Sequence, residues 1–332
     1  MISIQSIEAF GIHRWDQICD DFSTTLNHYS YFLDYLEISF NSKNCSYVVL
    51  VNGEPVVLVP FFEPFDSNLG PELILNGEPY SSPVLVCNLD NDDKIEILRI
   101  IRLNCERVFQ KWNQKTKYVS SAWSILESEK GTYALDLLES LETAETIRMD
   151  LLVDLSVGAD TLINSMSRSH FRTYNRSIKS GHSVIAVDHK ATPKQIEEYF
   201  SSYQMAHFVA AGRATRPQSS FDFMKELILL GRGVLFVCRS SNRNLSYLFC
   251  DYNDTFSRGW SQANSDHLQP GEFPRVITEL NAMLYFMQKG VQVYHLGIQE
   301  ITLNPTNDLE GILEFKRRFH PVQAESSVYS IG

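Results

Sequence analysis

Two strand–turn–strand patterns lie in opposite halves of the sequence, and each is followed by the same order of segments. In residues 47–62, Asn52-Gly53 separates two runs rich in β-branched residues, which is the strongest short signal for a β-hairpin. Residues 234–250 have the same plan with a longer polar turn. Helix-like stretches precede the hairpins at roughly 31–41 and 221–231. We therefore expect two β-hairpins, each preceded by a helix.

A long amphipathic helix and a strand follow each hairpin. Apolar residues recur every three or four positions in residues 92–113 and again in residues 273–289. In the second helix, Pro274 suits the first turn and Gly290 suits a left-handed cap. The expected following strands are 117–126 and 291–297. The repeated order predicts a tandem duplication of one α/β unit; the alternative is chance recurrence of common elements.

The length of the chain agrees with two domains. It has 332 residues, and single hydrophobic cores rarely grow beyond ~250–300 residues. A polar, acidic stretch at 127–149 separates the two halves. We expect an N-terminal domain at 1–147 and a C-terminal domain at 148–332, with the presumed active site in the second.

Composition narrows the possible partners. The formal net charge of −11 disfavours nucleic acid and anionic membranes on average, although a local basic groove can still bind phosphate. No basic stretch followed by an apolar one opens the sequence, and no apolar run is long enough for a membrane span, so we expect a cytoplasmic protein. The six cysteines lack zinc-ligand spacing, so no metal is expected. The sequence does not predict an oligomeric state.

A basic segment opens the second half. Residues Arg168, Arg172, Arg176 and Lys179 step by four, four and three, which places them on one face of a helix. No acidic residue occurs between Leu162 and Gly181. The segment is either a solvated helix face or a stripe that binds an anion, because guanidinium groups bind phosphate through paired hydrogen bonds.

Two further segments carry candidate binding residues. A loop with Arg213 and Arg216 enters a helix that Ser219 or Ser220 could cap, and a helix N-terminus attracts anions. An extended run, residues 256–264, contains Trp260 with small polar neighbours that include Asn264. Arg216, Trp260 and Asn264 are candidate substrate-binding residues; the alternatives are an ordinary capped loop and a tryptophan buried in a core.

The order of segments in the second half resembles the Fem-type, peptidoglycan bridge-forming aminoacyltransferases and related GNAT-like acyltransferases. Four anchors carry this resemblance, from about residue 160 to 320. They are the basic segment SRSHFRTYNRSIKSGHSV, the loop RATRPQSSFDFM, the helix-to-strand stretch from Lys289-Gly290 to Tyr294-His295-Leu296-Gly297, and Gly311 followed by Phe315-Lys316-Arg317-Arg318-Phe319. The first half matches only in plan, including Tyr80-Ser-Ser-Pro83 after its hairpin.

The resemblance implies an α/β fold with tandem GNAT-like acyltransferase domains, each a mixed, mostly antiparallel sheet flanked by helices. It implies that Phe315 and Lys316 sit at the reaction centre, where the Lys316 ammonium stabilises charge that develops on the acyl carbonyl. It also implies that Arg172 and Arg176 help to hold an anionic substrate. We expect this basic segment and Lys316 to converge on one hollow beside splayed strands.

Three departures from the family pattern leave the acyl donor open. His320-Pro321 stands where the family commonly has Gly-Gly. The chain has no room for the two-helix arm of the bridge-forming enzymes, which weakens aminoacyl-tRNA as a donor and transfer RNA as a partner. Only Gly271 matches the coenzyme A loop of GNAT proteins, since Leu268 and Phe273 occupy its other positions. The co-substrate is therefore either acyl-CoA or an aminoacyl-tRNA.

A general base is also needed, because an attacking amine must lose a proton. Asp251, at the end of a predicted strand, and His295, in the last strand of the anchor, are the candidates. We expect an enzyme that moves an acyl or aminoacyl group onto an amine of an anionic carbohydrate, such as a nucleotide sugar or a cell-wall or polysaccharide precursor. The alternative is a catalytically inactive GNAT-like binding module.

Overall fold

The structure is a computed structural model of the whole chain. It describes residues 1–22, 24, 26–40, 42–64, 80–81, 83–87, 89–109, 116–119, 135–136, 146–214, 216–266, 268–299 and 307–331. Residues 120–126 of the strand predicted at 117–126 and Ser82 of the Tyr80–Pro83 segment lie outside these ranges. Two compact units form, residues 1–149 with 324–332 and residues 150–323. The predicted domain border at 147/148 falls inside strand β10, Thr146–Asp154.

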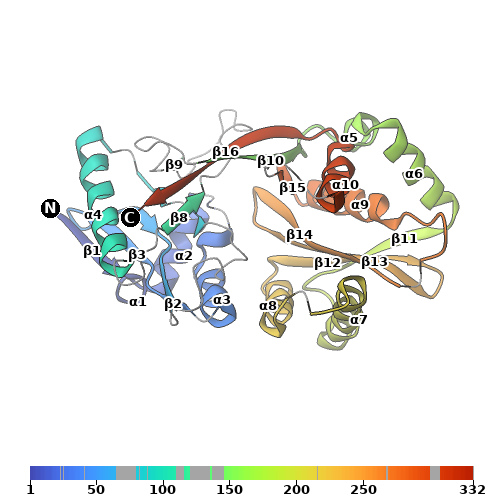
Figure 1. The fold of residues 1–332 in the computed structure, drawn as a ribbon, viewed down its shortest axis with the longest axis horizontal. Coiled ribbons are helices and arrows are strands. Elements are labelled where there is room, and N and C mark those ends of the chain that lie inside the picture. Colours follow the sequence, from blue (N-terminus) through green and yellow to red (C-terminus); the bar gives the residue numbers. More distant parts are fainter. Residues whose placement is uncertain are drawn as a thin grey trace. The chain divides into compact units, whose positions relative to one another are not determined.

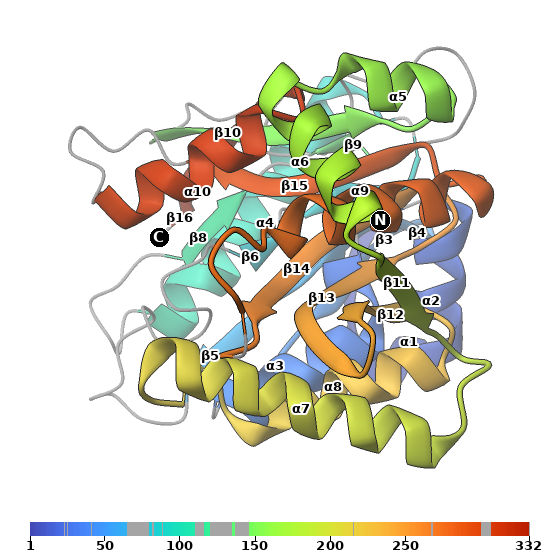
Figure 2. The ribbon, with the colours of Figure 1, turned by 90° about the vertical axis from the view of Figure 1, so that its right-hand side faces the viewer.

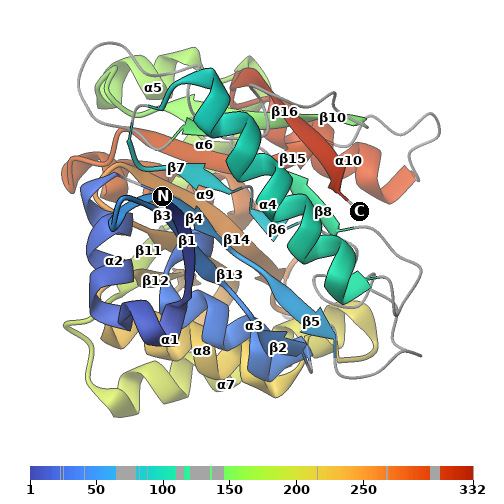
Figure 3. The ribbon, with the colours of Figure 1, turned by 90° about the vertical axis from the view of Figure 1, so that its left-hand side faces the viewer.

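Unit 1 (blue to teal in Figures 1 and 3) is a mixed α/β unit. Its helical elements are α1 (Ile7–Phe10), α2 (Ile12–Asp21), the 3-10 helix η1 (Leu26–His28), α3 (Ser30–Phe40) and α4 (Asn91–Phe109). Its strands are β1 (Ile2–Ser6), β2 (Ser42–Asn44), β3 (Tyr47–Val51), β4 (Glu54–Val59), β5 (Phe62–Pro64), β6 (Tyr80–Ser81), β7 (Val84–Leu85), β8 (Thr116–Val119) and β9 (Leu135–Asp136). β16 (Val322–Ile331) returns to this unit and pairs antiparallel with β8.

The first predicted hairpin is confirmed in unit 1. Strands β3 and β4 pair antiparallel around Asn52 and Gly53, whose φ angles of 53° and 89° are both positive. A two-residue hairpin turn of this kind needs positive φ at both positions, which explains the Asn-Gly pair. The strand order is β1-β3-β4-β7-β9, and all four of its pairings are antiparallel.

Unit 2 holds all the predicted site residues. Its helices are α5 (Ala159–Ser165), α6 (Arg168–Lys179), α7 (Pro193–Ala211), α8 (Gln218–Leu229), α9 (Pro274–Gln288) and α10 (Asn307–Arg317). Its other strands are β11 (His182–Val187), β12 (Gly233–Ser240), β13 (Arg243–Tyr252), β14 (Phe256–Asn264) and β15 (Val293–Gln299). They pair in the order β11-β12-β13-β14-β15-β10. Pairing is antiparallel from β11 to β14 and parallel between β14 and β15.

Helices cover both faces of the unit 2 sheet. In Figures 1 and 2, α7 and α8 lie along one face, and α6 and α9 lie on the other. Ring contacts agree with this arrangement: Phe249 of β13 meets Phe200 of α7, and Phe236 of β12 meets Phe286 of α9. We call the two sides the α7 face and the α9 face. A mixed, mostly antiparallel sheet flanked by helices confirms the predicted fold class at the level of architecture.

A single hydrophobic core fills the space between the sheet and helix α9 on the α9 face. It includes Val234, Phe236, Leu248, Leu280, Met283, Phe286 and Phe319. α9 is the predicted helix of residues 273–289; it begins at Pro274, and Gly290 follows it with φ of 84°. Since the helix is buried on most sides, any polar side chain that it carries toward the sheet is enclosed by the core.

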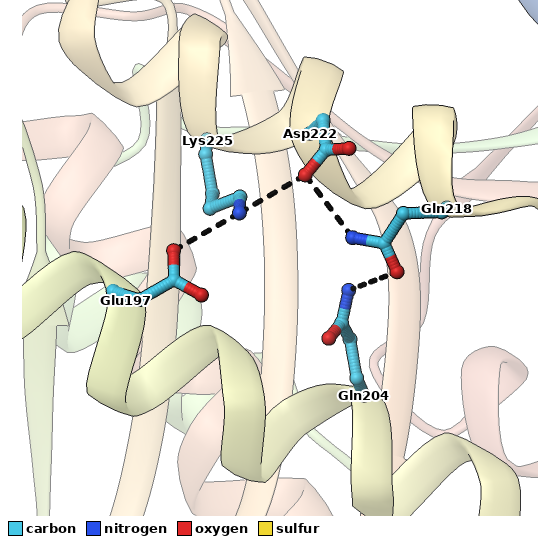
Figure 4. Close-up of polar contacts among 5 residues, drawn as sticks. All are labelled: Glu197, Gln204, Gln218, Asp222 and Lys225. Atoms are coloured by element: carbon cyan, nitrogen blue, oxygen red, sulfur yellow. Dashed lines mark hydrogen bonds and ion pairs between the residues drawn. The ribbon is translucent and has the colours of Figure 1, made fainter.

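Polar side chains join α7 to α8, as Figure 4 shows. Lys225 lies 3.0 Å from both Glu197 of α7 and Asp222 of its own helix. Gln218 donates to Asp222 at 3.1 Å and accepts from Gln204 of α7 at 3.3 Å. These contacts are mostly exposed, so the network aligns the two helices and adds modest stability.

Two negative findings concern the described residues only. Within those ranges, no helix is long and apolar enough to cross a membrane. The same residues contain no group of three or more His, Cys, Asp or Glu side chains placed to hold a metal ion.

Candidate functional site

Strands β14 and β15 part inside unit 2. They pair in parallel only from Phe256–Val293 to Arg258–His295, and their remaining described residues do not pair with each other. β14 is also irregular at this point, because Cys250 of β13 pairs with Gly259 while Phe249 pairs with Ser261. Trp260 is thus the extra residue of a β-bulge, a feature that redirects side chains and often lies next to active sites.

A buried carboxyl group lies beside the parting. Glu279 of α9 is only 5% exposed, and the Tyr294 hydroxyl of β15 donates a hydrogen bond of 2.6 Å to its Oε1. Burial raises the pKa of Glu279 to about 6, while the Tyr294 hydrogen bond and the charges of Lys316 and Arg275 act in the opposite direction. A carboxyl group with this pKa exchanges protons near neutral pH, as a general base must.

The ammonium group of Lys316 faces the same interior. A Cβ built on Gly297 would lie 2.3 Å from Lys316 Nζ, so the ammonium group rests directly on that glycine. Burial lowers the pKa of Lys316, and the charge of Glu279 opposes this shift. Lys316 and Glu279 therefore form a partly compensated pair of charges inside the unit.

Two glycines make room for this cluster. A Cβ on Gly259 would lie 2.7 Å from the Tyr294 hydroxyl and 3.2 Å from Glu279 Oε1. Gly297 has φ of 116°, a conformation that side-chain-bearing residues rarely adopt. Both glycines allow polar atoms to approach the backbone at the parting of β14 and β15.

Three buried polar atoms on this side have no hydrogen-bond partner among the described residues: Gln262 Nε2, Asn264 Oδ1 and Arg275 Nε. Ser261 contacts His207 of α7, and side chains alternate along a strand, so Gln262 and Asn264 point to the α9 face. Unpartnered buried polar atoms are costly, so a site that retains them is a candidate to receive a ligand or water. Asn264, a predicted substrate-binding residue, therefore belongs to the side of the sheet that α9 covers.

Phe315 contacts helix α6 through His170. The His170 ring lies 5.0 Å from the Phe315 ring, and its Nε2 lies 3.0 Å from the Phe315 carbonyl oxygen. Burial lowers the pKa of His170 to about 4, so the ring is neutral and can donate its proton to this carbonyl. The contact fixes the helical turn that carries Lys316.

The predicted basic segment forms helix α6, and Arg168, Arg172, Arg176 and Lys179 are all exposed. They lie on the side opposite His170, which contacts α10. The structure therefore does not bring this stripe and Lys316 into one hollow. Arg176 lines a separate pocket, described below, whose lining does not include Lys316.

Asp251 lies on the α7 face. Phe249 contacts α7, and Asp251 follows it by two residues on β13. Asp251 is fully buried, and Arg258 Nε donates to its Oδ1 at 3.1 Å while a second guanidinium nitrogen donates to Oδ2. Its alternating neighbour Cys250 faces Tyr294, with 3.6 Å between Sγ and the hydroxyl oxygen. Asp251 is thus held in an ion pair on the face opposite Glu279.

Arg216 and Trp260 meet on the α7 face. The Arg216 guanidinium carbon lies 5.8 Å from the Trp260 ring centroid, and that of Arg258 lies 5.4 Å from it. The prediction that Ser219 or Ser220 caps the following helix is wrong, because Pro217 occupies the cap position and no side chain caps α8. Trp260 also contacts Phe223 of α8, so the structure brings two predicted binding residues together beside a core.

His295 points away from Tyr294, its neighbour on β15. Its Nε2 lies 2.7 Å from Asp150 Oδ1 of β10, while its buried Nδ1 has no partner among the described residues. The pair resembles the acid–histidine arrangement of proton acceptors, but it lies apart from the hydrogen bond that joins Tyr294 to Glu279.

Glu279 and Tyr294 complete the cluster, although the sequence singled out neither as a catalytic candidate. Tyr294 belongs to the anchor that ends at Gly297. Glu279 lies between Val276 and Met283, within the apolar stripe of α9, and a charged residue at such a position is the signal that could have found it.

No protein-family profile and no curated protein sequence matches this chain. Solved structures do. FemX superposes with a TM-score of 0.66 over 99% of this chain and 97% of its own, at 11% identity. L-PGS from Bacillus licheniformis gives a TM-score of 0.55 over 96% and 91% at 10% identity, and a tandem GNAT protein from the clavulanic acid biosynthesis pathway gives 0.53 over 100% and 99% at 10% identity. At these identities the likeness is one of fold, and the chain has the tandem GNAT-like fold that it shares with FemX.

Proposed function

We propose that unit 2 transfers an acyl or aminoacyl group onto an amine, with Lys316 and Glu279 as the catalytic pair. The observation that carries this proposal is the Lys316 ammonium group against Gly297, where strands β14 and β15 part, with the buried Glu279 carboxyl near enough for each charge to affect the pKa of the other group. A fixed cation and a carboxylate that accepts a proton near neutral pH are the two groups that amide formation needs.

In the proposed reaction, the amine nitrogen bonds to the acyl carbon while the carbon–sulfur bond of a thioester, or the carbon–oxygen bond of an aminoacyl ester, breaks. The Lys316 ammonium group stabilises the negative charge that develops on the carbonyl oxygen. The Glu279 carboxylate takes the proton that the amine loses and returns it to the leaving group. Tyr294 orients that carboxylate through its 2.6 Å hydrogen bond.

This assignment replaces Asp251 and His295 as the favoured base. Asp251 is bound to Arg258, and His295 is bound to Asp150. Glu279 has the pKa, about 6, that suits a base near neutral pH. Phe315 then contributes by holding the turn of Lys316 through His170.

The resemblance and the structural neighbours support the donor and acceptor classes that we propose. Acyl-CoA is the favoured donor, since one structural neighbour of full coverage is a tandem GNAT protein, whose structure was solved without AcCoA. Aminoacyl-tRNA is the second donor, through the likeness to FemX. The acceptor is an amine on an anionic carbohydrate, such as a nucleotide sugar or a cell-wall or polysaccharide precursor.

Lys316→Ala tests the catalytic assignment, with Arg317→Ala as the matched control on the next, exposed residue of α10. Purified protein is incubated with acyl-CoA or aminoacyl-tRNA donors and a panel of carbohydrate amines, and mass spectrometry follows the modified amine. We expect Lys316→Ala to lower the transfer rate about 10²–10³-fold, as loss of an oxyanion-stabilising group does. Arg317→Ala should keep the wild-type rate.

Two outcomes contradict the proposal. Full activity in Lys316→Ala removes that residue from the mechanism. Binding of donor or acceptor by the wild-type protein, with no modified amine under any pairing, favours a GNAT-like binding module that lacks catalysis.

A further inference from the structure

A small polar pocket lies between α6, the β11–β12 edge and the loop that enters α9. It has a volume of about 90 Å³, and its lining includes Arg176 of α6, His182 of β11, and Glu272 and Phe273 of the loop before α9. β12 and β14 are separated by β13 in the sheet, and neither Lys316 nor Glu279 lines the pocket. It is therefore distinct from the Lys316–Glu279 cluster.

A buried histidine of this pocket has an unused hydrogen-bonding atom. The His182 side chain is 4% exposed, and its Nδ1 has no hydrogen-bond partner within the part of the chain that the structure describes. Its Nε2 lies 3.9 Å from Glu272 Oε1, too far for a hydrogen bond. Because an unpartnered buried polar atom carries a free-energy cost and His182 lines the pocket, this side of the pocket favours a ligand that supplies a further hydrogen-bond partner.

The rest of the lining offers donors of hydrogen bonds. Four hydroxyl groups line the pocket, on Thr173, Ser177, Ser180 and Ser240, and none has a side-chain hydrogen bond to another described residue. The Arg176 guanidinium group adds donors that match a tetrahedral oxyanion, and it has no ion-pair partner among the same residues.

Glu272 is the acidic member of the lining, and its charge is already compensated. Arg243 donates to its Oε1 at 2.8 Å, and the Gln269 N–H donates to its Oε2 at 2.7 Å. These contacts, the Gln269 N–H first, lower the pKa of Glu272. Next to it, α9 begins at Pro274 with no side-chain cap, so its first N–H groups add positive potential.

We propose that this pocket binds the phosphate group of an organic phosphate ester. Arg176, the hydroxyl groups and His182, in the tautomer that carries its proton on Nδ1, donate to the phosphate oxygens. Phe273, which is 55% exposed, lies in the lining and offers a flat apolar surface to the body of the ester. This deepens the proposed function, because it gives the anionic part of a substrate a place to bind, and it is testable without turnover.

Binding of two probes, inorganic phosphate and phenyl phosphate, is measured by isothermal titration calorimetry on the full chain. Arg176→Gln is compared with Arg172→Gln, which removes the same charge one turn earlier on the exposed side of α6, outside the pocket. We expect Arg176→Gln to weaken phosphate binding at least tenfold and Arg172→Gln to change it less than twofold. Phe273→Ala should weaken phenyl phosphate and leave inorganic phosphate unchanged.

Three results overturn the proposal. They are equal weakening by the two arginine variants, which indicates a general charge effect; absence of saturable phosphate binding by the wild-type protein; and unchanged phosphate binding in both Arg176→Gln and His182→Ala. Circular dichroism verifies that each variant is folded. Lys316→Ala, which tests transfer, should leave phosphate binding intact, so failure of one proposal is distinguishable from failure of the other.

Discussion

Buried charged side chains have different partners on the two faces of the unit 2 sheet. On the α7 face, Asp251 and Arg258 meet through two hydrogen bonds, and Arg258 also lies over Trp260. On the α9 face, Glu279 receives one hydrogen bond from Tyr294, and among the described residues its charge acts on Lys316 without a hydrogen bond between the two side chains. The Asp251 and Arg258 side chains therefore satisfy each other, whereas the Glu279 carboxyl and the Lys316 ammonium group retain hydrogen-bonding capacity.

This difference separates a structural role from a functional one. A buried ion pair whose partners satisfy each other has little capacity left for a substrate, and removal of one partner is costly for stability. A buried carboxyl with a raised pKa costs free energy while it is ionised, and such groups cluster at functional sites. The same sheet therefore offers a stability test on one face and an activity test on the other.

The largest effect is expected from Asp251→Asn. It leaves Arg258 in a mostly buried position without its anionic partner, and loss of one member of such a pair costs about 3 kcal/mol. Chemical denaturation followed by circular dichroism measures this loss of unfolding free energy. Transfer activity of the protein that remains folded should stay within a few-fold of wild type. A stable variant that has lost all transfer would instead return Asp251 to the catalytic role.

Glu279→Gln should have the reverse profile, with a loss of transfer of about 10²-fold and a smaller loss of stability at neutral pH than Asp251→Asn, because Lys316 loses a charge that only partly compensates it. The folded pKa of Glu279, about 6, lies above its ordinary value of 4.5. Its contribution to stability is therefore present below about 4.5 and is lost as pH rises through about 6. Glutamine, which never ionises, avoids that loss.

The pH profile gives this prediction a second readout. In the wild-type protein, the transfer rate at limiting substrate should rise as pH increases through about 6, because the carboxylate is the proton acceptor. Glu279→Gln should lack this rise. A variant that keeps the rise shows that another group, with the His295–Asp150 pair as the first candidate, is the base.

Most of the architecture was predictable because it depends on local signals. The Asn52-Gly53 turn, the 256–264 strand and the Pro274 helix start all appear where the sequence places them. The helix of residues 168–179 is also confirmed, but its basic residues remain exposed. Periodicity shows which residues share a helix face, but it does not show which neighbour that face meets.

The site was only partly predictable for the same reason. Lys316 and Gly297 belong to anchors of the resemblance, but their contact depends on where α10 lies relative to β15. Glu279 is the clearer omission, because a charged residue in an apolar stripe is detectable in the sequence, whereas its bond to Tyr294 depends on packing between α9 and β15. Asp251 lies on a strand and Glu279 lies on a helix. Only the three-dimensional packing shows that their carboxyl groups lie on opposite faces of the unit 2 sheet.

The smallest predicted effect comes from Gly297→Ala, with Gly311→Ala of α10 as its matched control. At Gly297 the new methyl group would meet Lys316 Nζ at 2.3 Å, and since the end of a lysine side chain moves easily, the ammonium group should shift. We expect a transfer rate about tenfold lower, together with a stability cost of about 1–3 kcal/mol for a non-glycine residue at positive φ.

Gly311 has no atom within 4 Å of a built Cβ and lies inside a helix, so alanine should stabilise the protein by about 0.5–1 kcal/mol and leave transfer unchanged. If both variants transfer at the wild-type rate, the position of the Lys316 ammonium group over Gly297 does not limit the reaction, and the functional role of the α9 face rests on Glu279 alone.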